Sequence, residues 1–230
     1  MICQISDLLV EIPEAGGMAP RCKGYESIEQ KNADIVIREE LYDFNRYPGI
    51  SEETQIYLQS GFQFYRELLR FDGLMLHASA VALDGKAYLF SGPCGVGKST
   101  HTKLWRAVFG EDVTVFNDDK PALRRLNGRW YAYGTPWCGK DGINVNMKVP
   151  LAGICFLKQS DRNEIRRIEG KHALAKVISQ TTYHLRSESK MQLMMTNVEK
   201  LITEIPIYEL CNKPEPEAVL MSYRAMCQST

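Results

Sequence analysis

The segment over residues 92–99 carries the most specific chemical signature in the sequence. It reads Gly-Pro-Cys-Gly-Val-Gly-Lys-Ser and fits GxxxxGK[ST] at every fixed position. Glycines let backbone N–H groups approach phosphate oxygens without a Cβ in the way. A helix that begins near Lys98 adds its positive end, while the Lys98 ammonium can span the β- and γ-phosphates and the Ser99 hydroxyl can bind Mg²⁺. The segment predicts a phosphate-binding loop with these cofactor-binding residues: Gly92, Cys94, Gly95, Val96, Gly97, Lys98, Ser99 and Thr100.

Two adjacent acids, Asp118 and Asp119, follow the apolar run 113–117. An acid at a strand end near a phosphate-binding loop can reach the Mg²⁺. A second acid there can accept the proton of an attacking hydroxyl. An acidic turn after a strand would account for the same residues, but the glycine-rich segment upstream favours the functional interpretation.

His77 lies in the apolar run that precedes the glycine-rich segment. We expect its strand beside the strand that leads into the loop, so the imidazole could touch an acid at a neighbouring strand end. The alternative is a core histidine whose hydrogen bonds are made inside the fold, and the sequence does not decide between the two interpretations.

The elements that must position these residues alternate between strands and helices. The pairs Asp84-Gly85 and Asn127-Gly128 predict tight hairpin turns. Hairpins give antiparallel pairs, and strand–loop–helix–strand gives a parallel pair, so we expect an α/β fold with a mixed sheet flanked by helices. The predicted strands cover 74–83, 86–92, 113–117, 122–126, 129–134, 152–159 and 205–210, and the predicted helices cover 98–109, 171–180, 189–203 and 215–226.

The first part of the chain reads as a small α+β segment. Its two predicted strands lie within 2–12 and 34–39, and an amphipathic helix is expected over 52–70, after Ser51. We divide the chain into this segment, residues 1–70, and a nucleotide-binding domain, residues 71–230.

Composition excludes several other classes of protein. The chain has 230 residues with 28 Lys and Arg against 28 Asp and Glu, so no global charge favours nucleic acid or a membrane surface. No run approaches a membrane span, and the first residues do not resemble a signal peptide. The seven cysteines include no CxxC pair, which argues against a zinc site or a disulfide framework. We expect a cytoplasmic protein.

The residues His77-Ala78-Ser79-Ala80-Val81, then 92–100, then Asn117-Asp118-Asp119 resemble the catalytic core of HPr kinase/phosphorylase. That family shares its P-loop architecture with the phosphoenolpyruvate carboxykinases. The resemblance covers about residues 73–158. It implies a kinase that uses ATP and Mg²⁺, with a fold like the C-terminal domain of HPr kinase.

The resemblance also implies a role for each residue. His77 would support the catalytic acid, Asp118 would be the proton acceptor, and Lys98 would bind the phosphates. Ser99 and Asp119 would lie at the metal. The loop 138–146 resembles a family loop that carries a metal-ligating Glu and an Arg, but here only Lys140 supplies a cation.

The sequence therefore predicts transfer of the γ-phosphate of ATP to a serine-type hydroxyl on a peptide, a protein or a small molecule. Two alternatives stay open: a nucleotide-binding regulatory protein with little catalysis, and a carboxykinase-like phosphotransferase. The oligomeric state is not determined.

Overall fold

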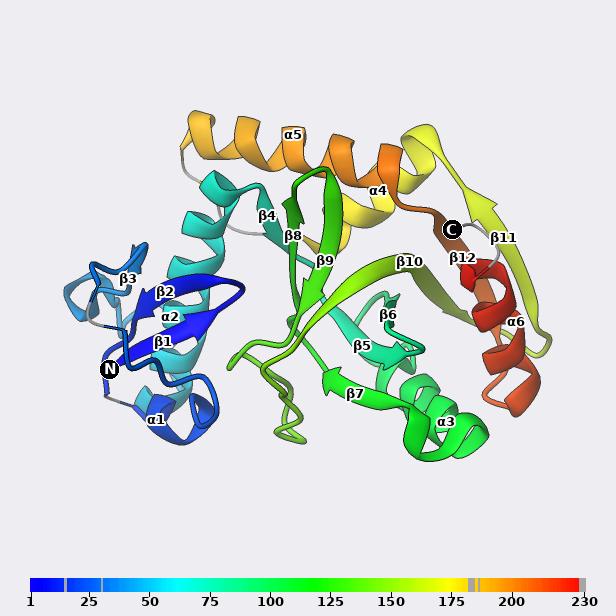
Figure 1. Cartoon of the computed structure of the whole chain (residues 1–230), viewed down its shortest axis with the longest axis horizontal. Helices are drawn as coiled ribbons and strands as arrows, with labels where there is room; N and C mark the ends of the chain where they lie inside the picture. The colour runs from blue at the N-terminus through cyan, green and yellow to red at the C-terminus, as the bar shows by residue number, and fades with distance from the viewer. Residues whose placement is uncertain (15, 30, 182–184, 186, 228–230) are drawn as a thin grey trace.

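The protein is described by a computed structural model that covers residues 1–14, 16–29, 31–181, 185 and 187–227. Within these residues the strands form a small sheet and a large one, with helices around them (Figure 1). The small sheet has the order β1-β2-β3, with β1 (Ile2–Ile5), β2 (Leu8–Glu11) and β3 (Ile35–Val36). The large sheet contains β4 (Gly73–Met75), β5 (Ala78–Leu83), β6 (Lys86–Ser91), β7 (Thr114–Asn117), β8 (Ala122–Leu126), β9 (Arg129–Tyr133), β10 (Lys148–Gln159), β11 (Glu164–Ile168) and β12 (Ile207–Asn212).

Six α-helices and three short 3-10 helices complete the described residues. The α-helices are α1 (Met18–Arg21), α2 (Glu52–Leu68), α3 (Lys98–Phe109), α4 (Gly170–Gln180), α5 (Glu188–Glu204) and α6 (Pro216–Cys227). The 3-10 helices are η1 (Glu39–Leu41), η2 (Leu69–Phe71) and η3 (Gly110–Asp112). Within the described part, none of these helices is both long enough and apolar enough to cross a membrane.

The large sheet is mixed and curled around the long strand β10. Its order is β4-β8-β9-β10-β6-β5-β7, with β12 also on β10 and β11 on β12. The first part of β10 pairs antiparallel with β9, and the rest pairs parallel with β6 and β12. Figure 1 shows β10 curving from one group of strands to the other. The prediction of a mixed α/β sheet flanked by helices is confirmed.

One detail of the predicted sheet is wrong. We expected the strand before the glycine-rich loop to pair in parallel with the strand after the following helix. In the structure, β5 lies between β6 and β7 and is antiparallel to both, and the parallel neighbour of β6 is β10. The hairpin at Asp84-Gly85 places β5 against β6 and leaves β7 only the outer edge of β5.

Alternating side chains on the central strands separate two layers of helices. On β6, Ala87 and Leu89 face one core with α4 and α5, whereas Tyr88 and Phe90 face another core with α3 and α6. Successive side chains of a strand point to opposite faces, so each face is covered by its own pair of helices. Trp105 of α3 is fully buried against Tyr88 and Phe90, which fixes α3 to the sheet.

Turn residues behave as their types predict. Asp84 and Gly85 have φ of 52° and 69°, and Asn127 and Gly128 have 49° and 80°, as tight hairpins require. The predicted strand run 2–12 is instead a hairpin, β1–β2, which turns at Ser6 and Asp7. The predicted strand 74–83 is two strands, because the chain leaves β4 and enters β5 on either side of His77. Helix α1 and strand β11 were not predicted from the sequence.

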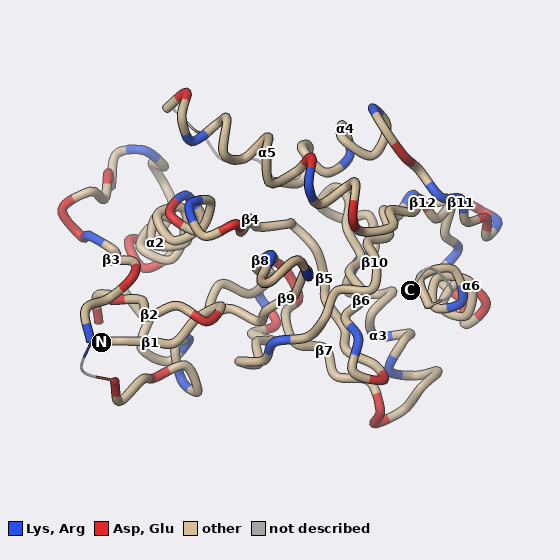
Figure 2. Tube along the Cα trace, turned by 45° about the horizontal axis from the view of Figure 1, so that its top comes forward, with Lys and Arg blue, Asp and Glu red and all other residues tan. Residues whose placement is uncertain are grey.

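The helix predicted over 52–70 is α2, and its side chains join a third core. Phe64, Tyr65 and Leu68 of α2 pack with residues of the small sheet and with Met75 and Tyr133 of the large sheet. The division into residues 1–70 and 71–230 stays a prediction. Figure 2 shows Lys and Arg interspersed with Asp and Glu along the trace.

Candidate active site

The glycine-rich segment forms the connection from β6 to α3. Gly92, Gly95 and Gly97 have φ of 143°, 79° and 106°, which residues with a Cβ rarely adopt. A Cβ on Gly92 would also come within 3.2 Å of the Leu157 carbonyl oxygen. Helix α3 begins at Lys98, and its N-cap Gly97 offers no side chain to the first N–H groups. The loop and the helix start therefore leave backbone donors open for an anion.

Lys98 is a buried cation that lacks an acidic partner within the described part of the chain. Its Nζ donates to the carbonyl oxygens of Gly92 and Pro93, at 3.1 and 3.3 Å. Burial lowers the pKa of the Lys98 ammonium from its ordinary value, and the charge of Asp119 opposes this effect. A buried ammonium bonded only to carbonyls is poorly compensated, so an anion in the loop would stabilise it. The neighbouring Ser99 hydroxyl has no hydrogen-bond partner among the described residues.

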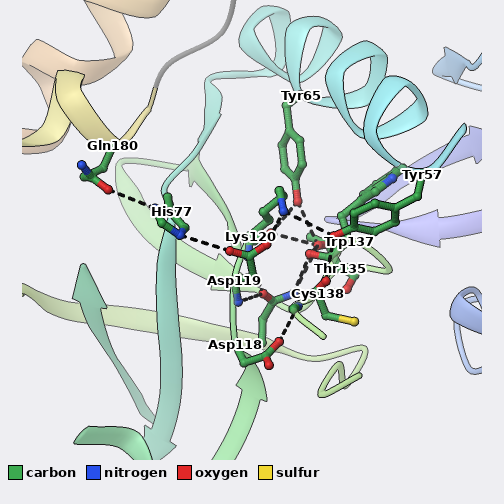
Figure 3. Close-up of polar contacts among 12 residues, drawn as sticks. Tyr57, Tyr65, His77, Asp118, Asp119, Lys120, Thr135, Trp137, Cys138 and Gln180 are labelled. Carbon is green, nitrogen blue, oxygen red and sulfur yellow. Dashed lines mark hydrogen bonds and ion pairs between the residues drawn. The ribbon is translucent and has the colours of Figure 1, made fainter. Parts of the chain in front are cut away.

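A buried asparagine shapes the turn that carries the two acids. The Asn117 Oδ1 accepts hydrogen bonds from the backbone N–H groups of Asp119 and Lys120, at 3.1 and 2.7 Å. Its Nδ2 donates to the Thr135 carbonyl at 3.2 Å, and the Thr135 hydroxyl donates to the Lys120 carbonyl at 2.9 Å. Tyr65 of α2 also donates to the Lys120 carbonyl. These bonds tie the turn to α2 and to the loop after β9; Figure 3 shows Tyr65 and Thr135 beside Lys120.

His77 contacts the second acid. Its Nε2 lies 3.2 Å from Asp119 Oδ1, and its Nδ1 lies 3.0 Å from the Gln180 Oε1 at the end of α4 (Figure 3). Lys120 pairs with the other Asp119 oxygen. Burial alone would raise the pKa of Asp119, but His77 and the Lys120 ammonium outweigh it and hold that pKa at about 2. Asp119 is therefore a carboxylate at neutral pH.

Asp118 has a different environment. Its Oδ1 accepts a hydrogen bond from the Gly139 backbone N–H at 2.6 Å. A Cβ on Gly139 would come within 2.8 Å of Asp118 Oδ2, so a larger residue there would displace the Asp118 carboxylate. Burial raises the pKa of Asp118 above its ordinary value, and the nearby charges of Asp119 and Asp141 act in the same direction. The two acids therefore differ in basicity because their surroundings differ.

The loop and the acids line one open cavity of ≈ 610 Å³, which we call the phosphate cleft. The topology explains this, because β5 is antiparallel to both β6 and β7. The start of β5 therefore meets the end of β6, where the loop begins, and the end of β7, which the acids follow. Ten of its lining residues are His77, Cys94, Gly95, Gly97, Lys98, Ser99, Thr100, Asp118, Asp119 and Lys140. Of the predicted site residues, Gly92 and Val96 do not line it; the Gly92 carbonyl accepts from Lys98 Nζ. The predicted role of each residue stays a prediction.

The expected partner of His77 is different in the structure. The resemblance implied that His77 supports Asp118, but the imidazole contacts Asp119. Asp118 is instead oriented by Gly139. The physical reason is the turn at Asn117, which directs the two successive carboxylates to different neighbours.

Two residues of this arrangement, Lys120 and Gln180, were not predicted from the sequence. Lys120 follows the acid pair directly, and its position beside two acids was a usable signal. Gln180 is distant from the acids along the chain, and no local pattern marks it. Gly139 lies in the loop 138–146 that carries the resemblance, but its contact with Asp118 was not predicted. The Cys138 thiol beside Gly139 is buried, and burial raises its pKa.

The donor set of the phosphate cleft fits a magnesium ion. Mg²⁺ prefers oxygen ligands and usually takes only one or two carboxylates from the protein. The cleft offers the Ser99 hydroxyl and the carboxylates of Asp118 and Asp119. Among the described residues no group of three or more His, Cys, Asp or Glu gathers to hold a metal without a ligand's help.

Comparison with known families identifies the chain. The family model for the SynChlorMet cassette protein ScmC matches residues 54–213. The chain belongs to this family. The ScmC match runs from the start of α2 through β12 and includes all the predicted site residues. The ScmC name itself states no reaction.

Comparisons with curated proteins and with solved structures add little about chemistry. No curated protein matches the chain. Among solved structures, the chain is similar to the HPr(Ser) kinase/phosphatase from Coxiella burnetii, with 12% sequence identity and a TM-score of 0.36. The alignment covers 67% of this chain and 95% of the other. A TM-score this low does not establish a shared fold.

Proposed function

We propose that this protein is an ATP- and Mg²⁺-dependent kinase that phosphorylates a serine-type hydroxyl. The observation that carries the proposal is the phosphate cleft, where Lys98, Ser99 and both acids line one cavity of ≈ 610 Å³. A buried cation and open helix N–H groups suit phosphate, and adjacent carboxylates suit a metal ion and a proton.

In the reaction, the backbone N–H groups of the glycine-rich loop and the Lys98 ammonium hold the β- and γ-phosphates. The acceptor oxygen forms a bond to the γ-phosphorus, and the bond from that phosphorus to the oxygen shared with the β-phosphate breaks. The electrons of the broken bond stay on ADP. Asp118 takes the hydroxyl proton, and its raised pKa makes it a better base than an ordinary carboxylate.

The metal would be held by the Ser99 hydroxyl and Asp119, which stays ionised because its pKa is about 2. When bound, Mg²⁺ would neutralise charge on the phosphates during transfer. His77 and Lys120 fix the orientation of the Asp119 carboxylate through one contact to each of its oxygens. Lys98 contributes positive charge on the side of the loop.

Space for the nucleoside lies on the far side of the loop. Another open cleft, of ≈ 450 Å³, which we call the nucleoside cleft, is lined by Pro93, Cys94, Gly95 and Val96 together with the end of β10. It shares Cys94 and Gly95 with the phosphate cleft. A nucleotide whose phosphates occupy the phosphate cleft can therefore extend past the loop into the nucleoside cleft.

The proposal is tested in cells that carry either the wild-type chain or the Asp118→Asn variant. Phosphopeptides and phosphorylated metabolites are compared by mass spectrometry, and each candidate acceptor is then incubated with purified protein and γ-labelled ATP. We expect one or a few phosphorylated products that disappear with the variant. Unchanged products in cells, together with no binding of Mg·ATP by calorimetry, would refute the kinase assignment.

A further inference from the structure

A second cavity, of ≈ 330 Å³, adjoins the phosphate cleft at the acid pair. Asp119, Gly139 and Lys140 line both cavities. The other wall comes from the N-terminal part of the chain, with Arg21 at the end of α1 and Glu53, Thr54 and Tyr57 on α2. A molecule in this second cavity would therefore lie next to the phosphates across Asp119.

Tyr57 joins the two walls of the second cavity. Its hydroxyl donates to the Cys138 carbonyl at 2.7 Å and accepts from the Lys120 Nζ at 3.3 Å (Figure 3). The Arg21 guanidinium stacks over its ring, with Cζ 4.5 Å from the centroid. One aromatic side chain thus positions a cation from the N-terminal part and a cation from the acid turn.

Further contacts fix α1 and α2 against the site. The Trp137 indole N–H donates to the Ser60 hydroxyl at 3.1 Å, and its ring stacks on Phe64 at 4.7 Å. The Asn144 side-chain amide donates to the Arg21 carbonyl at 3.1 Å. The N-terminal wall is therefore held in place by the loop that follows β9, which also carries Gly139.

Arg21 is half-buried and has no ion-pair partner within the described part of the chain. Its Nη1 makes one weak contact, to the Cys138 sulfur at 3.5 Å. The stacking on Tyr57 leaves the planar fork of the guanidinium oriented but not neutralised. A carboxylate matches that fork with two parallel hydrogen bonds, and the pre-oriented plane reduces the entropy lost on binding.

The charge and size of the cavity define its ligand further. The lining includes the cations Arg21, Lys120 and Lys140 and the acids Glu53 and Asp119, and Asp119 is already paired with Lys120. A net positive lining favours an anion. A volume of ≈ 330 Å³ is at the small end of ligand pockets, which span about 300–1,000 Å³, so it suits a group of amino-acid size.

We propose that this second cavity binds the hydroxyl acceptor, and that Arg21 binds a carboxylate of the acceptor close to the hydroxyl. The inference rests on the proposed kinase function and adds the chemical class of the acceptor. The carboxylate belongs either to a small hydroxy acid or to an acidic residue beside the serine of a peptide. This proposal also gives the N-terminal part of the chain a role, because that part forms the cavity wall that selects the acceptor.

The first test needs no catalysis and no variant. Wild-type protein is treated with phenylglyoxal, and the rate of arginine modification is followed peptide by peptide with D-glycerate, L-serine or uncharged glycerol present. We expect glycerate and serine to slow modification of Arg21 several-fold, whereas glycerol has no effect. Arg46, which also stacks on aromatic rings but lines neither cavity, should react equally in all cases.

The second test compares acceptors in matched pairs with γ-labelled ATP: L-serine against L-serinamide, and a serine peptide with a neighbouring Asp against the same peptide with Asn. In each pair we expect the acceptor with the carboxylate to be phosphorylated faster. The pair in which this preference appears shows whether the carboxylate belongs to a small hydroxy acid or to a peptide. In Arg21→Gln, KM for that member should rise about 10–100-fold, the loss for a charge-assisted hydrogen bond. The Kd for Mg·ATP should stay unchanged, Arg21→Lys should recover part of the effect, and Arg46→Gln should match wild type.

These outcomes separate the two proposals. If a non-hydrolysable ATP analogue binds with Mg²⁺ but neither carboxylate protects Arg21, the acceptor cavity is wrong and the kinase assignment stands. Equal use of both members of each pair would also overturn it. If carboxylates protect Arg21 but no acceptor is ever phosphorylated, the anion site stands and the kinase assignment fails.

Discussion

His77 Nε2 lies 3.2 Å from the Asp119 carboxylate, while the adjacent Asp118 accepts a hydrogen bond from Gly139. Two successive acids thus have separate supports. His77 is in turn held by Gln180, whose side-chain Oε1 accepts from Nδ1 at 3.0 Å and whose backbone carbonyl accepts from the His77 backbone N–H. A change at His77 should therefore act through Asp119 and the metal, not through the proposed base.

For His77→Ala we expect the loss of activity to come mainly from weaker Mg²⁺ binding and only to a small extent from the base. Loss of a supporting group behind a metal ligand typically lowers metal affinity about 10–100-fold. The Mg²⁺ concentration for half-maximal activity should rise accordingly, while activity at saturating Mg²⁺ falls less than in Asp118→Asn. His172→Ala is the matched control, because His172 lies near Glu209, outside the phosphate cleft. An unchanged Mg²⁺ dependence would contradict the role of Asp119 at the metal.

For Lys98→Ala we expect weak Mg·ATP binding and no measurable turnover. The ammonium is the buried cation of the loop, so its removal takes charge from both the bound phosphates and the transition state. Calorimetry and an ATP turnover assay measure the two effects. Arg106→Ala on the same helix removes an exposed cation that pairs with Glu111, and it should behave as wild type. Normal nucleotide affinity and turnover in Lys98→Ala would refute the phosphate-binding loop.

For Asp118→Asn we expect nucleotide affinity to survive and phosphoryl transfer to fall by about 10²–10⁴-fold. The amide keeps the shape of the side chain but cannot take a proton. Because the pKa of Asp118 is raised, the wild-type rate should climb with pH through a value above that of an ordinary aspartate. The residual rate of Asp118→Asn should not show this rise with pH. Asp161→Asn, on the exposed β10–β11 turn, is the control, and a normal rate in Asp118→Asn would make Asp119 the first alternative as base.

Asp119 should contribute to stability in a pH-dependent way. Its pKa is about 2 in the folded chain and near its ordinary value when unfolded, so the carboxylate stabilises the fold above about pH 4. The contribution, about 2 kcal/mol, is lost as the pH falls from about 4 towards 2. Urea unfolding of wild type and Asp119→Asn should therefore show a gap in the free energy of unfolding at pH 7 that narrows at pH 3. A gap that stays constant would mean that the ion pairs of Asp119 do not lower its pKa.

Local sequence determined those features that depend on neighbouring residues. The glycines at 92, 95 and 97 specify a loop because only they tolerate its φ angles, and the helix after it begins at Lys98 as predicted. Asp84-Gly85 and Asn127-Gly128 specify their hairpins for the same reason. The acid pair after an apolar strand also marked the site.

Tertiary structure decided which groups meet. Gly139 reaches Asp118, Gln180 reaches His77 and Arg21 reaches Tyr57 from distant parts of the chain, and no periodicity encodes such contacts. They depend on the strand order that inserts β5 between β6 and β7 and on the packing of α2 against the large sheet. The sequence by itself determined the glycine-rich loop and the acid pair, because backbone conformation and residue type are local properties. Only the fold decided that His77 contacts Asp119 and that Arg21 lines a cavity together with Asp119, because long-range packing brings these residues together.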